Sequence, residues 1–160
     1  MAPIRAEKTL RALATSNGAR TIECIARAVI QEDGKFLLCR GKGNGSWFFP
    51  GGHIEEGESA PESLTREIME EIGEKSEVQR FVGATENKYR TKNDEVHEIN
   101  LVFEVSLLDT GLCESQEDHL EFAWLTREEL HEAIVFPATL RDAVLATHTK
   151  EKPFWTSEGF

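Results

Sequence analysis

Residues Gly52 to Glu74, GHIEEGESAPESLTREIMEEIGE, predict a helix whose two ends are both marked in the sequence. Ser59 and Glu62 have the S-x-x-E spacing of a capping box, so the helix is expected to begin just after Ser59. Gly73 stands where a left-handed C-terminal cap is expected. Between the caps an apolar residue recurs at every fourth position and predicts the buried side of the helix: Leu64, Ile68 and Ile72.

The same helix carries an acidic stripe. Glu67, Glu70 and Glu71 are spaced three and four residues apart, so their side chains lie on one side of the helix. Carboxylates this close repel one another unless a cation compensates their charge. Mg²⁺ is a hard cation that typically takes a few carboxylates together with substrate phosphate oxygens. The helix alone leaves two interpretations open, a solvated acidic face and a metal site.

The pattern around the helix separates these two interpretations. Gly52, Glu58 and the run Arg66-Glu67-Ile68-x-Glu70-Glu71-x-Gly73 occur at offsets that match the Nudix box. The restricted positions of the box agree except at Glu74, where the family usually has an aliphatic residue. The chain therefore resembles the Nudix hydrolases, which act on a nucleoside diphosphate linked to another group.

The rest of the chain predicts an α/β fold. Strands are expected at 21–31, 35–40, 47–51, 78–86, 96–107 and 121–125. The segment 87–95 is polar and is expected to be a mobile loop. A second capping box, Thr126 with Glu129, predicts a helix to about His131, and Pro137 starts a last helix.

The resemblance implies a single-domain Nudix α/β/α sandwich with a mixed β-sheet, in which the box is a loop–helix–loop. The expected division is an N-terminal lead-in at 1–20, the Nudix hydrolase domain at 21–150 and a C-terminal tail at 151–160. The tail carries two aromatic residues that look exposed, Phe154 and Trp155. It either packs across the domain or serves an interface.

The chemistry that these residues suit is metal-assisted hydrolysis. Metal ions screen phosphate charge, lower the pKa of bound water and orient phosphates for in-line attack. Glu67, Glu70 and Glu71 are the predicted ligands, because hard cations prefer oxygen. The family also uses a backbone carbonyl at this turn, which falls on Gly51 or Gly52. The resemblance implies an Mg²⁺-dependent hydrolase, with Mn²⁺ as a substitute, that cleaves a pyrophosphate bond in a nucleoside diphosphate derivative by water attack on phosphorus.

Two further box residues are predicted to support this site. Arg66 and Glu58 have an orienting role in the family, and mutual charge pairing explains why both types are needed. With Glu67 and Glu70 they form the predicted catalytic set of the box.

The general base is open between a box glutamate and an acid on a later loop. Three acids precede Trp124 on such a loop, and Glu117 is the preferred one: Glu114, Glu117 and Asp118. Glu86 and Glu98 compete with it.

Substrate choice is the least determined feature. Arg27, Arg40 and Arg90 are candidates to bind phosphate through charge-assisted hydrogen bonds, although an arginine in such a position is more often a plain surface residue. Trp47 offers a stacking face for a base or packs in the core. Tyr89 lies beyond the box where dinucleoside polyphosphate hydrolases of the family often have a tyrosine. Nucleoside triphosphates, dinucleoside polyphosphates and nucleotide sugars all remain open.

Composition restricts the partners. The 160 residues carry a net charge of −11, which argues against a large nucleic-acid surface and disfavours an RNA 5′-end pyrophosphohydrolase. A nucleotide-binding regulatory Nudix domain with little catalysis is the other alternative, although every box carboxylate and Arg66 are present. No stretch is long and apolar enough to cross a membrane. Three cysteines that form neither an even set nor a CxxC pair favour the cytoplasm. A homodimer is left open.

Overall fold

The computed structural model describes residues 22–109, 113–146 and 152–160, so the predicted lead-in at 1–20 lies outside the described residues. In chain order the elements are β1 (Ile22–Glu32), β2 (Lys35–Gly41), β3 (Gly51–His53), α2 (Ala60–Ile72), β4 (Ser76–Arg90), β5 (Glu95–Leu107), β6 (Leu120–Thr126), α3 (Arg127–Glu132), α4 (Ala138–Ala146) and β7 (Phe154–Glu158). Among these residues, no helix is long and apolar enough to cross a membrane.

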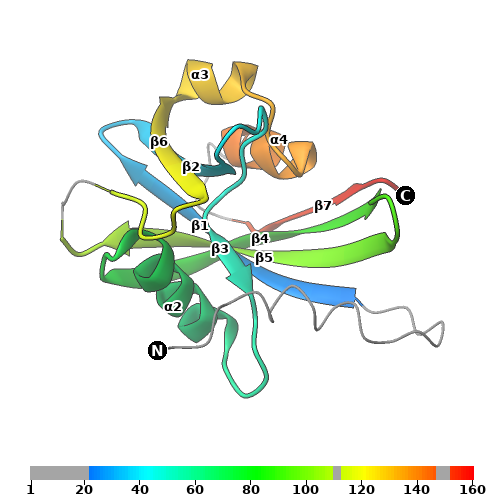
Figure 1. Cartoon of the computed structure of the whole chain (residues 1–160), viewed down its shortest axis with the longest axis horizontal. Helices are drawn as coiled ribbons and strands as arrows, with labels where there is room; N and C mark the ends of the chain where they lie inside the picture. The colour runs from blue at the N-terminus through cyan, green and yellow to red at the C-terminus, as the bar shows by residue number, and fades with distance from the viewer. Residues whose placement is uncertain (1–21, 110–112, 147–151) are drawn as a thin grey trace.

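The strands form one mixed sheet. Its order is β6-β2-β1-β5-β4-β7, and β3 pairs with β1 beside this path. The β1–β5 and β4–β7 pairs are parallel, whereas the other pairs are antiparallel. Figure 1 shows α2 against one face of the sheet and α3 with α4 against the other. The predicted α/β/α sandwich with a mixed sheet is therefore confirmed.

A separate apolar core fills each side of the sheet. On the α2 side, the predicted stripe Leu64, Ile68 and Ile72 is buried against β1 and β2. On the opposite side, residues of α3 and α4 pack on Phe49 and on the sheet. Each fully buried Leu or Ile side chain contributes about 1.5–3 kcal/mol of transfer free energy. These cores fix α2, and with it the acidic stripe, relative to β1.

The sheet opens between β1 and β2. These strands pair only next to their turn, at Gln31↔Phe36 and Glu32↔Lys35. Farther along, β1 pairs with β3 instead, through Ile25–Arg27 and Gly51–His53. The chain enters the box at Gly51, which has φ +131° and whose added Cβ would lie 2.1 Å from the Ala26 carbonyl oxygen. Only glycine allows this approach, so the box begins inside the opening.

Two sequence expectations were wrong in detail. The short strand expected at 47–51 lies at Gly51–His53, and Trp47 and Phe48 form isolated bridges because their partners are Val135 and Cys39. The loop expected at 87–95 is mostly strand, because Lys88 and Arg90 on β4 pair with Glu95 on β5. Only a tight turn separates the two strands.

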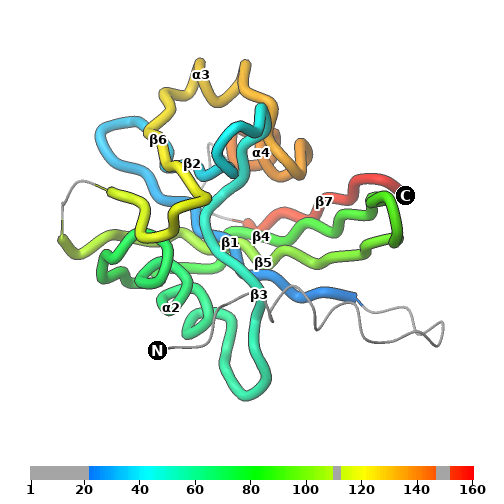
Figure 2. The backbone as a smooth tube through the Cα atoms, in the orientation of Figure 1, coloured from blue at the N-terminus to red at the C-terminus, as the bar shows by residue number. Residues whose placement is uncertain are grey.

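The C-terminal segment packs across the domain. Figures 1 and 2 show β7 running along β4, with the C terminus near the β4–β5 turn. Phe154, which looks exposed in the sequence, is half-buried against the α3–α4 core, whereas Trp155 is exposed as expected. The Thr85 and Thr156 hydroxyls are 2.6 Å apart across this strand pair. The sheet therefore gains an edge strand that local sequence patterns do not predict.

Candidate active site

Helix α2 has the ends that the sequence predicts. Ser59 Oγ accepts from the Glu62 N–H at 3.4 Å, and Glu62 Oε2 accepts from the Ser59 N–H at 2.8 Å. Gly73 has φ +76°, and its N–H donates to the Met69 carbonyl. A capping box satisfies N–H groups that have no partner inside the helix. The acidic stripe thus lies on a helix fixed at both ends.

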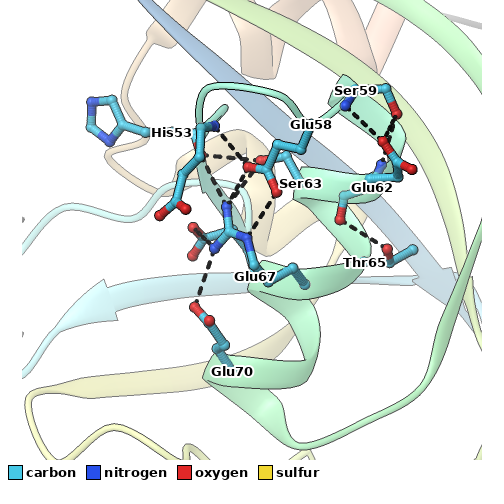
Figure 3. Close-up of polar contacts among 10 residues, drawn as sticks. His53, Glu58, Ser59, Glu62, Ser63, Thr65, Glu67 and Glu70 are labelled. Carbon is cyan, nitrogen blue, oxygen red and sulfur yellow. Dashed lines mark hydrogen bonds and ion pairs between the residues drawn. The ribbon is translucent and has the colours of Figure 1, made fainter.

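Arg66 connects the acidic residues of the box. Its Nε and Nη2 donate to the two carboxylate oxygens of Glu58, at 3.0 and 2.7 Å. Its Nη1 donates to Glu67 Oε1 at 2.6 Å and to Glu70 Oε2 at 3.2 Å. Figure 3 shows Glu58 and Glu70 approaching these contacts from opposite sides, with Glu67 between them. The pairing expected between Arg66 and Glu58 is present, and it extends to two more carboxylates.

Glu58 fastens the loop before α2 to the helix. Besides its two bonds from Arg66, Glu58 Oε1 accepts from the Glu55 N–H at 2.7 Å. The Arg66 hydrogen bonds are the main reason that the pKa of Glu58 is lowered to about 2. Arg66 Nη2 also donates to the His53 carbonyl. The loop 53–58 and the helix therefore form one hydrogen-bonded unit, visible in Figure 3.

Glu71 is the buried member of the acidic stripe. It is 6% exposed, and its Oε2 atom has no hydrogen-bond partner. Burial, and next the charge of Glu67, raise the pKa of Glu71 to about 8. The backbone N–H of Gly51 partly opposes this rise in pKa. A carboxylate that is held in an apolar setting with one oxygen unsatisfied is suited to take a cation.

Glu67 lies in a space that only glycine leaves open. A Cβ added to Gly52 would lie 2.6 Å from Glu67 Cδ and 2.8 Å from each carboxylate oxygen. Within residues 22–109, 113–146 and 152–160, however, no group of three or more His, Cys, Asp or Glu side chains is arranged to hold a metal ion. Glu67 and Glu70 are both paired with Arg66. The hard oxygen donors and the unsatisfied Glu71 oxygen fit a divalent metal once Glu67 leaves Arg66.

Of the three acids on the later loop, the structure brings Glu117 to the box. The Gln116 N–H donates to the Glu71 carbonyl at 2.7 Å, which ties this loop to the end of α2. The charge of Glu117 contributes to the raised pKa of Glu71. Glu117 is half-buried, whereas Glu114 and Asp118 are exposed.

Arg27 reaches the box from β1. Its Nη1 donates to the Phe49 carbonyl at 3.1 Å and lies 3.5 Å from the Gly51 carbonyl oxygen. Its Nε donates to Asn100 Oδ1 at 3.1 Å. The arginine predicted to bind phosphate therefore also positions the backbone at the entrance to the box.

The other predicted substrate residues lie elsewhere. Arg40 pairs with Glu121 and stacks over Trp47, with its guanidinium carbon 4.2 Å from the ring centre. Tyr89 is 43% exposed near the end of β4, and burial and then Glu98 raise its pKa. Arg90 is exposed and pairs with Glu95.

A family model resolves the identity of the chain. The NUDIX domain model matches residues 23–146. The chain belongs to the NUDIX family. The sequence resemblance is thereby confirmed, and the acidic stripe is the box of a family that is generally dependent on divalent metal.

Relatives and solved structures agree with this membership. The nucleoside triphosphatase NudI of Salmonella paratyphi B is 34% identical over 123 residues, which are 69% of this chain and 84% of that protein. A crystal structure of a UDP-X diphosphatase matches with a TM-score of 0.65 and 23% identity, over 97% of this chain and 76% of that one. An ADP-ribose pyrophosphatase from Streptococcus suis matches with a TM-score of 0.63 and 20% identity, over 86% and 99%. Both structures share the fold, and together with the family they support a hydrolase that cleaves a pyrophosphate bond.

The buried polar side chains of the sheet were not predicted as a group. Glu98 was considered only as a competing base, and Asn87 and Asn100 were not singled out. All three are buried, at 6%, 7% and 0% exposure. A signal exists in the sequence: Glu98 and Asn100 alternate with apolar residues in a strand with a buried face.

We expect the stability of the metal-free Nudix protein to fall as pH rises from 4.5 toward 8. Glu71 keeps its proton to about pH 8 in the fold, whereas its ordinary pKa is 4.5. Between these values the native state binds a proton that the unfolded chain has lost, so this stabilisation is complete below pH 4.5 and is lost by pH 8. Each unit of pKa difference corresponds to about 1.4 kcal/mol. Urea unfolding with chelator, at a series of pH values, measures the effect.

The matched comparison is Glu71→Gln, which cannot titrate. The difference in unfolding free energy between the two proteins should change with pH over this range and should shrink when Mg²⁺ is added. Parallel pH curves for the two proteins would contradict the assignment.

Two adjacent glycines should respond differently to alanine. In Gly52→Ala the new Cβ would collide with the Glu67 carboxylate, which is the end of a flexible side chain and can rotate away, so we expect the protein to fold. Because the carboxylate is then misplaced, kcat should fall roughly tenfold to a hundredfold. Gly51→Ala pushes on the Ala26 carbonyl of a central strand at positive φ, so we expect little folded protein. Circular dichroism melts and a hydrolysis assay separate the two effects. Equal activity of Gly52→Ala and wild type would show that the position of Glu67 is unimportant.

Proposed function

We propose that this Nudix protein is an Mg²⁺-dependent hydrolase of nucleoside triphosphates. The observation that carries the proposal is the buried, unsatisfied Oε2 of Glu71 beside Glu67, on a helix held by Arg66 and Glu58. This arrangement costs folding stability unless a cation compensates it, which favours a metal-binding role over a solvated acidic face. The name of the NudI relatives, nucleoside triphosphatases, supports the substrate class.

Glu67 and Glu71 would hold the metal, with Glu70 beside them and a carbonyl of Gly51 or Gly52 as a further oxygen donor. When bound, the metal supplies charge screening at the phosphates and a lower pKa for water. Arg66 keeps Glu58 and the loop 53–58 on the helix, so that the ligands return to one arrangement after each turnover. Arg27 contacts the two carbonyls that precede the box, and its charge faces the same region. Mn²⁺ has the same hard-oxygen preference and is proposed as a substitute.

Glu117 is the proposed general base. It is half-buried on the loop tied to Glu71, within electrostatic reach of that carboxylate. A general base accepts the proton of the attacking water, and an amide in its place cannot. We expect Glu117→Gln to lower kcat roughly a hundredfold. The control is Glu114→Gln, an exposed acid of the same loop that should keep wild-type kcat, and a wild-type kcat in Glu117→Gln would move the role to a box glutamate.

The proposal is tested by hydrolysis of a nucleotide panel. The panel contains canonical nucleoside triphosphates, dinucleoside polyphosphates, ADP-ribose and nucleotide sugars, each with Mg²⁺, Mn²⁺ or chelator. We expect one or more triphosphates to be cleaved well ahead of the others, with loss of activity in chelator. A nucleotide sugar or ADP-ribose ahead of the triphosphates would correct the substrate class, and no hydrolysis by a folded, metal-binding protein would favour a regulatory domain. A cytoplasmic location and a homodimer stay predictions.

A further inference from the structure

A row of buried polar side chains crosses the sheet on the face opposite α2. Strand register places Asn100 of β5 beside Thr85 of β4, and Thr85 beside Thr156 of β7. The next row along the strands joins Glu98 to Asn87, whose Nδ2 donates to Glu98 Oε1 at 3.0 Å. Because side chains alternate between faces, these residues share one face.

This row continues to the N-terminal end of α4. Asn87 is paired in register with Glu158 of β7, and Glu158 accepts from the Thr139 N–H at 2.9 Å. Polar groups placed on a face that is otherwise apolar reduce stability unless they are all satisfied. The sheet would be more stable with apolar residues here, which points to a function for this row.

Two atoms of this region are not satisfied. Asn100 is fully buried, and its Nδ2 has no hydrogen-bond partner. Its orientation is fixed, because Oδ1 accepts from Arg27 Nε at 3.1 Å and Nδ2 must then point elsewhere. The Thr139 hydroxyl is also buried without a partner. A buried donor without an acceptor reduces folding stability, so the native protein is expected to meet an acceptor there.

The row begins at the box. Arg27 contacts Asn100 with Nε and the Gly51 carbonyl with Nη1, and Gly51 directly precedes Gly52, the first residue of the box. At about 3.4 Å per residue, Glu98 lies roughly 7 Å beyond Asn100 on β5. A molecule with its phosphates at Glu67 and Glu71 can therefore extend its remaining part along this row, toward the exposed Tyr89 ring.

We propose that Asn100 and Glu98 read the base of the nucleotide, in an extension that rests on the proposed triphosphatase function. Asn100 Nδ2 donates to a base acceptor, a carbonyl oxygen or a ring nitrogen. The Glu98 oxygen that Asn87 does not occupy accepts from a neighbouring base N–H. The ligand class is a heterocycle with a donor beside an acceptor on one edge.

The test measures binding without turnover. Calorimetry compares the α,β-methylene analogues of dGTP, dUTP, dATP and dCTP, together with inorganic tripolyphosphate as a probe that has no base. The variant is Glu98→Gln: Asn87 holds the amide oxygen, so the free end changes from an acceptor to a donor. The control is Glu86→Gln, which removes a carboxylate from β4 on the opposite face of the same hairpin.

We expect wild-type affinity to differ at least about tenfold among the four bases. Glu98→Gln should lose roughly tenfold to a hundredfold for the preferred base and reorder the bases, with tripolyphosphate binding unchanged. Preference for dGTP and dUTP would assign a ring N–H beside a carbonyl as the edge read, and preference for dATP and dCTP an amino group beside a ring nitrogen. Equal affinities for all bases, no binding of any analogue, or Glu98→Gln behaving as Glu86→Gln would overturn the base-reading role. Failure of hydrolysis with this binding pattern intact would overturn the triphosphatase function alone.

Discussion

Glu71→Gln should lower kcat by roughly a thousandfold or more, which exceeds the effect of losing one well-placed hydrogen-bond donor in other active sites. The change keeps the shape of the side chain and removes the charge that a cation needs. It also removes the cost of burying that charge, since Glu71 is 6% exposed and its Oε2 has no partner. The metal-free variant should therefore melt at a higher temperature than the metal-free wild type at pH 8, although it is nearly inactive.

Three measurements decide this result: turnover of the preferred triphosphate with Mg²⁺, the melting temperature with chelator, and Mn²⁺ affinity by electron paramagnetic resonance. The matched control is Glu74→Gln, which removes one charge three residues away, outside the acidic stripe. It should keep wild-type turnover. A folded Glu71→Gln protein with the full Mg²⁺-dependent rate would remove Glu71 from the metal site.

In Glu71→Gln we expect activity to fall and metal-free stability to rise. These opposite changes also distinguish a metal ligand from a structural carboxylate. A structural role predicts that activity and stability fall together, because a buried carboxylate that supports the fold would lose its favourable contacts. A ligand role predicts that activity falls while metal-free stability rises.

Local sequence patterns predict the local part of the structure. The ends of α2 follow from Ser59, Glu62 and Gly73, because capping involves residues within one turn of each other. The Arg66–Glu58 pair lies within the same box, and its contact was expected from the orienting role that the family resemblance implies and from the opposite charges.

Contacts between distant segments were not predictable in the same way. β7 pairs with β4, although the paired residues are 71 positions apart in the chain. The alternating pattern of FWTSE does not indicate which strand it pairs with. The sequence predicts that Arg27 is either a surface arginine or a phosphate-binding arginine. In the fold, the opening between β1 and β2 brings it to the carbonyls of Phe49 and Gly51. Glu117 is preferred among three similar acids in the sequence, but that its loop is tied to the end of α2 is seen only from the Gln116–Glu71 hydrogen bond. In each case the deciding information is which strand or loop lies opposite.

Arg66→Lys should be the most damaging conservative change in the box. The guanidinium makes two bonds to Glu58 and one each to Glu67 and Glu70, and an ammonium group cannot reproduce this planar arrangement. We expect a loss of roughly 1–3 kcal/mol in unfolding free energy, because Arg66 and Glu58 are only 24% and 17% exposed. We also expect roughly a hundredfold loss in kcat as Glu67 loses its resting position.

The control is Arg80→Lys, whose Glu104 pair on the sheet is more exposed and should change stability by less than about 1 kcal/mol. In a double-mutant cycle, Glu58→Gln should cost little once Arg66 is lysine, because both substitutions break the same contact. Additive effects would show that Arg66 acts on the other carboxylates and not through Glu58.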